Sequence, residues 1–179
     1  MRPDPDCRLC DLCNGRTNLV LPSGNLSSGV VFVGEAPGEK EDISGKPFVG
    51  RSGKLLDSIM EEEGVDRDKV MITNTVKCRP PGNRDPTENE MKACRPFLDH
   101  ELYDKKLVIG LGKSACRDLM GYEGKMSDVA NIMVTIRIKD RDVNFIPTYH
   151  PAACIYSKEA RGALRETMRI IIDKFSEEL

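Results

Sequence analysis

Four of the chain's seven cysteines form two pairs that lie far apart in the sequence, and this arrangement strongly constrains the fold. Cys7 and Cys10 form a C-x-x-C motif near the N-terminus. Cys78 and Cys94 bracket a basic segment that contains several prolines. Because four thiolates suit one zinc ion or one iron–sulfur cluster, a shared metal centre would fasten the N-terminus to the middle of the chain.

The spacing of the cysteines leaves both the metal and the ligand set open. Zinc is the default occupant of a split four-cysteine site, but soft sulfur ligands also select iron–sulfur clusters. Cys13 extends the first motif to C-x-x-C-x-x-C, so any two of its three cysteines could be ligands. Cys116 lies in a predicted helix and is expected to be a small buried side chain, whereas Cys154 could serve packing or a contact surface.

Length and composition describe one ordinary globular domain. The 179 residues can bury a core, and no apolar segment approaches the roughly 20 residues that cross a bilayer. The first residues lack the apolar core of a secretory signal, so we expect a cytoplasmic protein that binds no membrane. In a reducing compartment, cysteines serve as metal ligands more readily than as disulfides.

The net charge of −2 argues against a nucleic-acid partner, but the charges are unevenly distributed. Lys77, Arg79 and Arg84 lie in a segment without acidic residues, and Arg51 follows a glycine-rich segment. Acidic residues concentrate at 61–63 and near the C-terminus. Charge alone therefore fits a solvated mixed surface as well as a phosphate-binding face.

Apolar runs that predict strands alternate with patterns that predict helices. We expect strands at residues 30–33, 70–73, 107–110, 132–138 and 143–146, and helices at 55–60, from 87 past 94, at 115–120 and at 164–175. Pro96 is expected to bend the second of these helices or to end its first part. The alternation predicts a three-layer α/β/α sandwich around a central, mostly parallel sheet, in a single domain of residues 1–179. Ligands of such sheets bind beyond the carboxyl ends of the strands, where segments 34–53, 74–84 and 149–156 lie.

These segments hold four candidate site features, each with a structural alternative. The glycine-rich segment 34–42 lets backbone amides approach a ligand but lacks the closing Gly-Lys-Ser/Thr of a Walker A loop, so a plain turn is equally consistent. Phe48 could stack on a ligand or plug the core. Asn74 could read a ligand or form an Asx-turn. His150 is one of two histidines, and the other, His100, lies in a charged stretch.

Together, these motifs closely resemble those of the family 4 uracil-DNA glycosylases, the iron–sulfur-containing members of that superfamily. The motifs are Gly-Glu-Ala-Pro-Gly-x-x-Glu-Asp, Gly-Lys-Pro-Phe-Val-Gly-Arg, Thr-Asn-x-Val-Lys-Cys-Arg-Pro-Pro-x-Asn-Arg and His-Pro, in this order. The resemblance covers the chain from Cys7 to its last predicted helix. It implies an enzyme of base-excision repair that removes uracil from single- or double-stranded DNA, leaves an abasic site and acts as a monomer.

The resemblance also selects the metal and its ligands. Family members carry a 4Fe–4S cluster, and Cys7, Cys10, Cys78 and Cys94 match its four ligands. Cys13 then remains as a spare thiol. Because hydrolysis requires no electron transfer, the cluster is expected to be structural.

A glycosylase must rotate its target base out of the DNA, and the matching residues imply a pocket for that base. Phe48 is expected to stack on the flipped ring, and Asn74 to accept N3–H of uracil while donating to O4. Glu41 is expected to crowd C5 and so to exclude the methyl group of thymine. Backbone groups of the first motif are expected to contact the base, namely those of Gly34, Glu35 and Ala36.

The implied chemistry uses one histidine and one carboxylate. His150 would donate to uracil O2 as negative charge develops on the departing base. Better-known relatives of family 1 carry an aspartate that handles the attacking water, whereas this chain has Ala36 near that point. Glu35 is the nearest carboxylate and is expected to take a catalytic role.

Further residues are expected to hold the DNA. Ile155, together with Tyr156, would wedge into the gap left by the flipped base, in place of the leucines usual in the family. Positive side chains would bind phosphates and make binding salt-dependent, namely Arg51, Lys77, Arg79 and Arg84.

Two other functions are weighed against hydrolysis. A four-cysteine protein that only binds DNA would need no base-reading pocket. A superfamily relative that remains covalently attached to abasic DNA carries a basic insertion with a histidine after the second strand. Here Lys77 leads directly into Cys78 without such an insertion.

Overall fold

A six-stranded sheet forms the centre of the computed structural model, which describes residues 1–179. The strand order is β1-β3-β2-β4-β6-β5. The strands are β1 (Ser23–Gly24), β2 (Val30–Gly34), β3 (Met71–Asn74), β4 (Leu107–Leu111), β5 (Val134–Ile138) and β6 (Arg141–Thr148). The four inner strands run parallel, and β1 and β5 pair antiparallel at the edges. The predicted α/β class with a mostly parallel sheet is confirmed.

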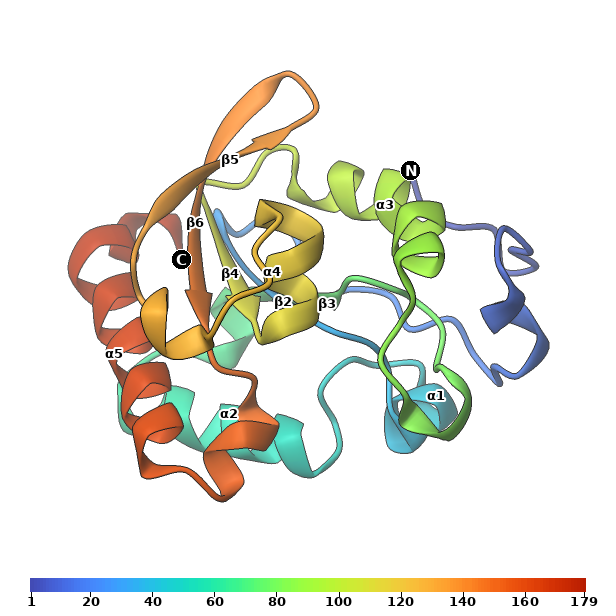
Figure 1. Cartoon of the computed structure of the whole chain (residues 1–179). Helices are drawn as coiled ribbons and strands as arrows, with labels where there is room; N and C mark the ends of the chain where they lie inside the picture. The colour runs from blue at the N-terminus through green and yellow to red at the C-terminus, as the bar shows by residue number, and fades with distance from the viewer.

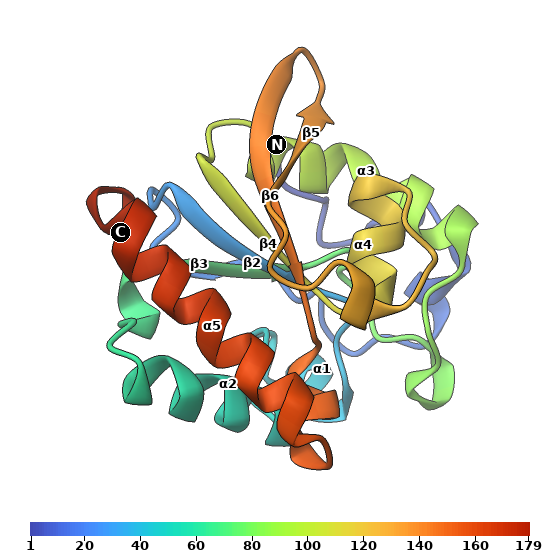
Figure 2. The same ribbon diagram turned by 60° about the vertical axis from the view of Figure 1, so that its left-hand side comes forward.

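Helices cover both faces of the sheet (Figure 1, Figure 2). They are α1 (Glu39–Ser44), α2 (Arg51–Glu62), α3 (Glu88–Leu102), α4 (Lys113–Met120) and α5 (Lys158–Phe175). Because side chains alternate along a strand, Phe32 and Ile109 cluster with α2 and α5, whereas Val31 and Val108 cluster with α3 and α4. These clusters form the two cores of the predicted sandwich. None of the helices combines the length and the hydropathy needed to span a bilayer.

One local prediction was wrong. Segment 34–53, expected to be a loop, contains α1, which Gly45 ends with a φ of 72°. Helix α3 continues through Pro96, so of the two expected outcomes, a bend or an end, the end does not occur. A capping box between Thr87 and Glu90 starts the helix, and Leu98 and Leu102 are fully buried in its second half. Packing of this half on the sheet thus outweighs the hydrogen bond that the proline removes.

The strand order reverses direction at β2, which places a crevice beside it. β3, the next inner strand in the chain, lies on one side of β2, and β4 lies on the other. The connecting helices α2 and α3 lie on opposite faces of the sheet (Figure 2). Ligands of doubly wound sheets bind at such a reversal, outside the carboxyl ends of the strands. The segments after β2, β3, β4 and β6 all start at this edge.

Candidate active site

The segments that follow β2, β3 and β6 bring four predicted site residues together. Gly34 pairs with Asn74 in the parallel register of β2 and β3. A Cβ atom added to Gly34 would lie 2.4 Å from the ring of Phe48 and 2.5 Å from Asn74 Oδ1. The rings of Phe48 and His150 are 5.8 Å apart between centroids, at 31°. A glycine at position 34 is therefore required for the approach of these side chains.

Phe48 belongs to the core, which is one of its two predicted alternatives; stacking on a ligand stays a prediction. Its side chain belongs to the core cluster of α2 and α5, and it also approaches His150. Its backbone has a φ of 53°, a region that non-glycine residues rarely occupy and that stores strain. A Cβ atom at Gly53 would lie 1.9 Å from the Phe48 carbonyl oxygen, so the start of α2 packs directly against this backbone. The Phe48 backbone is thus held against the start of α2, and its ring lies beside Gly34 and His150.

Asn74 ends β3 with a buried amide whose Oδ1 atom has no hydrogen-bond partner. A buried polar atom without a partner costs about 1–3 kcal/mol. The atom can accept a hydrogen bond from a ligand N–H group. The unpaired acceptor therefore favours a ligand that donates a hydrogen bond at this position.

Glu41 presents a second unpaired acceptor. Its Oε1 atom accepts the Gly38 backbone N–H at 3.2 Å, which caps α1, while Oε2 is buried without a partner. A Cβ atom at Gly50 would lie 3.1 Å from Oε2. Helix α1, which the sequence did not predict, therefore fixes this carboxylate beside the loop that carries Phe48.

His150 is held in one tautomer. Its Nδ1 atom accepts the Ala152 backbone N–H at 3.1 Å, so the ring proton lies on Nε2. Burial lowers the pKa of His150 to about 4, which keeps the ring neutral near pH 7. Gly112, with a φ of 89°, allows the ring to approach, since a Cβ atom there would lie 2.9 Å from His150 Cβ. The residue is a neutral donor through Nε2.

Glu35 is fixed through both its backbone and its side chain. Thr75 Oγ1 donates to its carbonyl oxygen at 2.5 Å, and Ser114 Oγ donates to Oε2 at 2.6 Å. Burial raises the pKa of the Glu35 carboxyl, the Ser114 hydrogen bond lowers it, and Asp85 raises it. Sequence reasoning missed Ser114 and Asp85. The only signal for Ser114 was its place in a strand–glycine–helix turn after residues 107–110.

The thiols gather around a separate small cavity. Its lining includes all four predicted ligands and also Cys13, whose Sγ atom lies 3.6 Å from Asn14 Oδ1. Arg16 Nη1 donates to the Cys7 carbonyl at 2.7 Å and lies 3.5 Å from Cys78 Sγ. No group of three or more histidine, cysteine or carboxylate side chains has the arrangement that would hold a metal ion. The lining supplies thiols from two distant segments and no carboxylate or histidine, a donor set that suits either zinc or an iron–sulfur cluster.

One predicted DNA contact is wrong. Lys77 is fully buried, and its Nζ atom donates to Thr73 Oγ1, to the Asn74 carbonyl and to Glu101 Oε2, each at 2.7 Å. Its charge is therefore neutralised inside the protein and cannot reach a phosphate. The lysine instead supports the backbone of Asn74.

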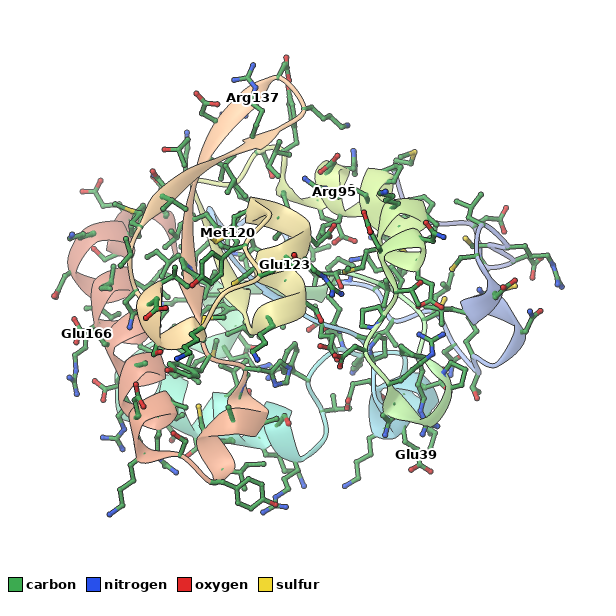
Figure 3. All side chains as sticks on the ribbon, viewed as in Figure 1. Glu39, Arg95, Met120, Glu123, Arg137 and Glu166 are labelled. Carbon is green, nitrogen blue, oxygen red and sulfur yellow. The ribbon has the colours of Figure 1, made fainter.

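The other predicted DNA contacts lie nearer the surface. Arg51 and Arg84 are exposed, although Arg84 forms a two-bond ion pair with Glu90 at 2.9 and 2.6 Å. Arg79 is half-buried, with its Nε atom 2.7 Å from Asn83 Oδ1. Elsewhere, charged side chains of both signs point outward, as Glu166 on α5 and Arg137 on the β5–β6 hairpin show (Figure 3).

In the segment after His150, Tyr156 is the prominent exposed side chain. It is 86% exposed, whereas Ile155 is half-buried and Cys154 is buried. The Sγ atom of Cys154 lies 3.7 Å from the His150 carbonyl oxygen. Cys154 therefore packs beneath the segment, and Tyr156 extends furthest from it.

This fold and pocket define a class of protein, and comparisons with known proteins agree on it. The model of the uracil DNA glycosylase superfamily matches residues 21–172, and the chain belongs to this superfamily. Within it, the chain belongs with the type-4 uracil-DNA glycosylases. It is 41% identical to the type-4 enzyme of Sulfurisphaera tokodaii over 172 residues, which cover 92% of this chain and 78% of the relative. Identity to the type-4 enzyme of Saccharolobus solfataricus is 41%, covering 95% and 82%, and to that of Thermotoga maritima 38%, covering 93% and 84%.

Proposed function

We propose that the chain hydrolyses the N-glycosidic bond of uracil in DNA, releasing free uracil and leaving an abasic site for base-excision repair. The observation that carries this proposal is the buried, unpaired Oδ1 atom of Asn74 beside Phe48 and His150. A protein that only bound the DNA backbone would gain nothing from an unsatisfied buried atom.

The pocket reads uracil by its hydrogen-bonding edge. Asn74 Oδ1 accepts N3–H, and its amide nitrogen donates to O4. Cytosine offers an acceptor at N3 and a donor at N4, so it would leave both atoms mispaired, at about 1–3 kcal/mol for each. The base must leave the helix stack to reach this amide.

Phe48 and Glu41 complete the recognition of the ring. Phe48 stacks on the flipped base, and its strained backbone fixes the plane of that contact. Glu41 stands beside C5 and excludes the methyl group of thymine. Backbone groups of Gly34, Glu35 and Ala36 contact the base from the end of β2.

Bond cleavage moves negative charge onto the base and positive charge onto the sugar. Neutral His150 donates from Nε2 to uracil O2, where the negative charge develops. The Glu35 carboxylate stabilises the sugar and holds the attacking water. A preformed donor such as His150 Nε2 contributes about 10²–10³ in rate.

The thiol-lined cavity would hold a 4Fe–4S cluster on Cys7, Cys10, Cys78 and Cys94, with Cys13 as the spare thiol. When bound, the cluster would fasten the N-terminal segment to the start of α3 and to the loop after β3. Arg16 would lie against its thiolates and offset part of their negative charge.

The chain would act as a monomer and bind DNA through the surface around the proposed site. Arg51, Arg79 and Arg84 bind phosphates, and the affinity falls as salt concentration rises. Tyr156 with Ile155 fills the gap left by the flipped nucleotide. Arg84 must release Glu90 to reach a phosphate, so it contributes less than Arg51.

Uracil release tests this function directly. The purified protein is incubated with single-stranded and duplex oligonucleotides that contain one uracil, and with matched oligonucleotides that contain thymine or cytosine. Free uracil and an alkali-labile site should form only from the uracil substrates, without added metal. On a denaturing gel, a shifted protein–DNA adduct would instead indicate the covalent relative, and unchanged DNA would indicate a protein that only binds.

A further inference from the structure

A part-buried hydrogen bond links the segments that follow two neighbouring strands of the sheet. Glu35 follows β2, Ser114 lies in the first turn of α4 after β4, and β2 and β4 pair in parallel. Ser114 Oγ donates to Glu35 Oε2 at 2.6 Å. The bond lies at the reversal of strand order, where a doubly wound sheet places its ligand.

The Ser114 hydroxyl is not required by its own helix. Gly112 is the N-cap of α4, and no side chain caps this end. Ser114 is the second residue of the helix, 4% exposed, and its hydroxyl points to a residue on another strand. Helix formation would be served equally by alanine at this position. The hydroxyl therefore acts on Glu35.

Charged groups from two other parts of the chain act on the same carboxyl. Asp85, from the loop before α3, raises the pKa of Glu35, and Arg117, from α4, lowers it. Burial raises this pKa most, and the Ser114 hydrogen bond opposes the effect of burial. Together, burial and these neighbours raise the pKa of Glu35 above its ordinary value.

We propose that Ser114 is a positioning residue that orients Glu35 and favours its ionised form for catalysis. The inference rests on the proposed glycosylase function. It adds a residue that lies outside the motifs quoted for the site.

Replacement of Ser114 tests its proposed effect on Glu35. Ser114→Ala should lower the single-turnover rate of uracil release about tenfold at neutral pH. The acid limb of the pH–rate profile should move to higher pH, because the hydrogen bond that favours the carboxylate is lost. Affinity for duplex DNA with a non-cleavable 2′-fluorodeoxyuridine should change less than about twofold. Ser114→Thr, which keeps the hydroxyl, should restore most of the rate.

Replacement of Asp85 should have the opposite effect. Asp85→Asn removes the neighbouring negative charge, so the acid limb should move to lower pH. Ser58→Ala is the matched control, because Ser58 Oγ donates to Glu62 Oε1 at 3.2 Å on α2, away from the pocket. The proposal would be overturned if Ser114→Ala lowered the rate equally at every pH. It would also be overturned if the acid limbs of the pH–rate profiles of the two variants moved in the same direction.

A second measurement separates this inference from the proposed function. Carbon-13 NMR of labelled glutamate carboxyls follows the titration of Glu35 whether or not the chain releases uracil. His150, which changes charge at about pH 4, does not contribute to a carboxyl signal. Opposite shifts of the Glu35 midpoint in the two variants support the assignment even in an inactive chain. An unchanged midpoint in Ser114→Ala overturns it even in an active one.

Discussion

Asn74 and Lys77 lie three residues apart and are both buried, yet the fold treats their polar atoms in opposite ways. The Lys77 ammonium group has three partners at 2.7 Å, whereas Asn74 Oδ1 has none. The first arrangement stabilises the loop that leads to Cys78. The second leaves an acceptor for a ligand, at the expense of stability. The same segment thus contains a structural half and a functional half.

The largest expected effect is the loss of the Lys77 ion pair. Lys77→Met leaves the Glu101 carboxylate, whose side chain is only 10% exposed, without its ionic partner, so the free energy of unfolding should fall by about 3–5 kcal/mol. Chemical denaturation monitored by circular dichroism measures this change.

A double variant and a control make the test specific. Lys77→Met combined with Glu101→Leu should regain much of the stability, because no unpaired charge remains. Lys105→Met is the matched control, since Lys105 is also buried but pairs with the exposed Asp104 and the Leu26 carbonyl. A loss as large in the control as in Lys77→Met would contradict the special role of the Lys77 network.

Substitution of the proposed catalytic histidine should change the rate of uracil release and leave stability almost unchanged. His150→Leu removes the Nε2 donor, and the single-turnover rate of uracil release should fall about 10²–10³-fold. The Ala152 N–H that loses its partner lies near the surface and can bind water. Thermal unfolding should therefore change little, and an unaltered rate would remove His150 from the mechanism.

Features set by residues close together in the sequence could be predicted from it. Contacts between residues far apart in the sequence could not. The buried strands at 30–33 and 107–110 are marked by local apolar runs, and the pocket residues by short motifs. Lys77 was assigned to the surface because its neighbours in the sequence are basic and polar. Lys77 lies in the loop after β3 and its partner Glu101 in α3, and only the packing of α3 beside β3 brings the two together.

The contact of Ser114 with Glu35 was unpredictable for the same reason. It requires β4 to lie next to β2, and strand order is not encoded in any short segment. Pro96 shows the converse, since a strong local signal to end a helix yields to burial of the residues beyond it. Local patterns therefore indicated the strands and the candidate site residues, whereas tertiary packing determines how these residues are supported.

A smaller effect is expected in the pH dependence of stability, and it comes from His150. The pKa of His150 is about 4 in the folded chain, below its ordinary value of about 6.5 in the unfolded chain. The unfolded state therefore binds more protons between these values, and stability falls as pH is lowered through this window. The contribution reaches about 2 kcal/mol near pH 5.

Urea unfolding across this window isolates the effect. His150→Gln should flatten the fall in stability relative to the wild type. His100→Gln, which removes the chain's other histidine from an exposed position on α3, is the matched control. An equal fall in the wild type and in His150→Gln would show that the histidine is not buried in its neutral form.

The smallest effect is the most direct test of the contrast between the two halves. Asn74→Leu replaces the unpaired amide with an apolar group of similar size, so the free energy of unfolding should rise by about 1 kcal/mol. This corresponds to an increase of about 2–4 °C in the melting temperature. The same variant should lose uracil release, because it can neither accept N3–H nor donate to O4. A variant that becomes less stable would indicate that Asn74 supports the fold, and the segment would then have no separate functional half.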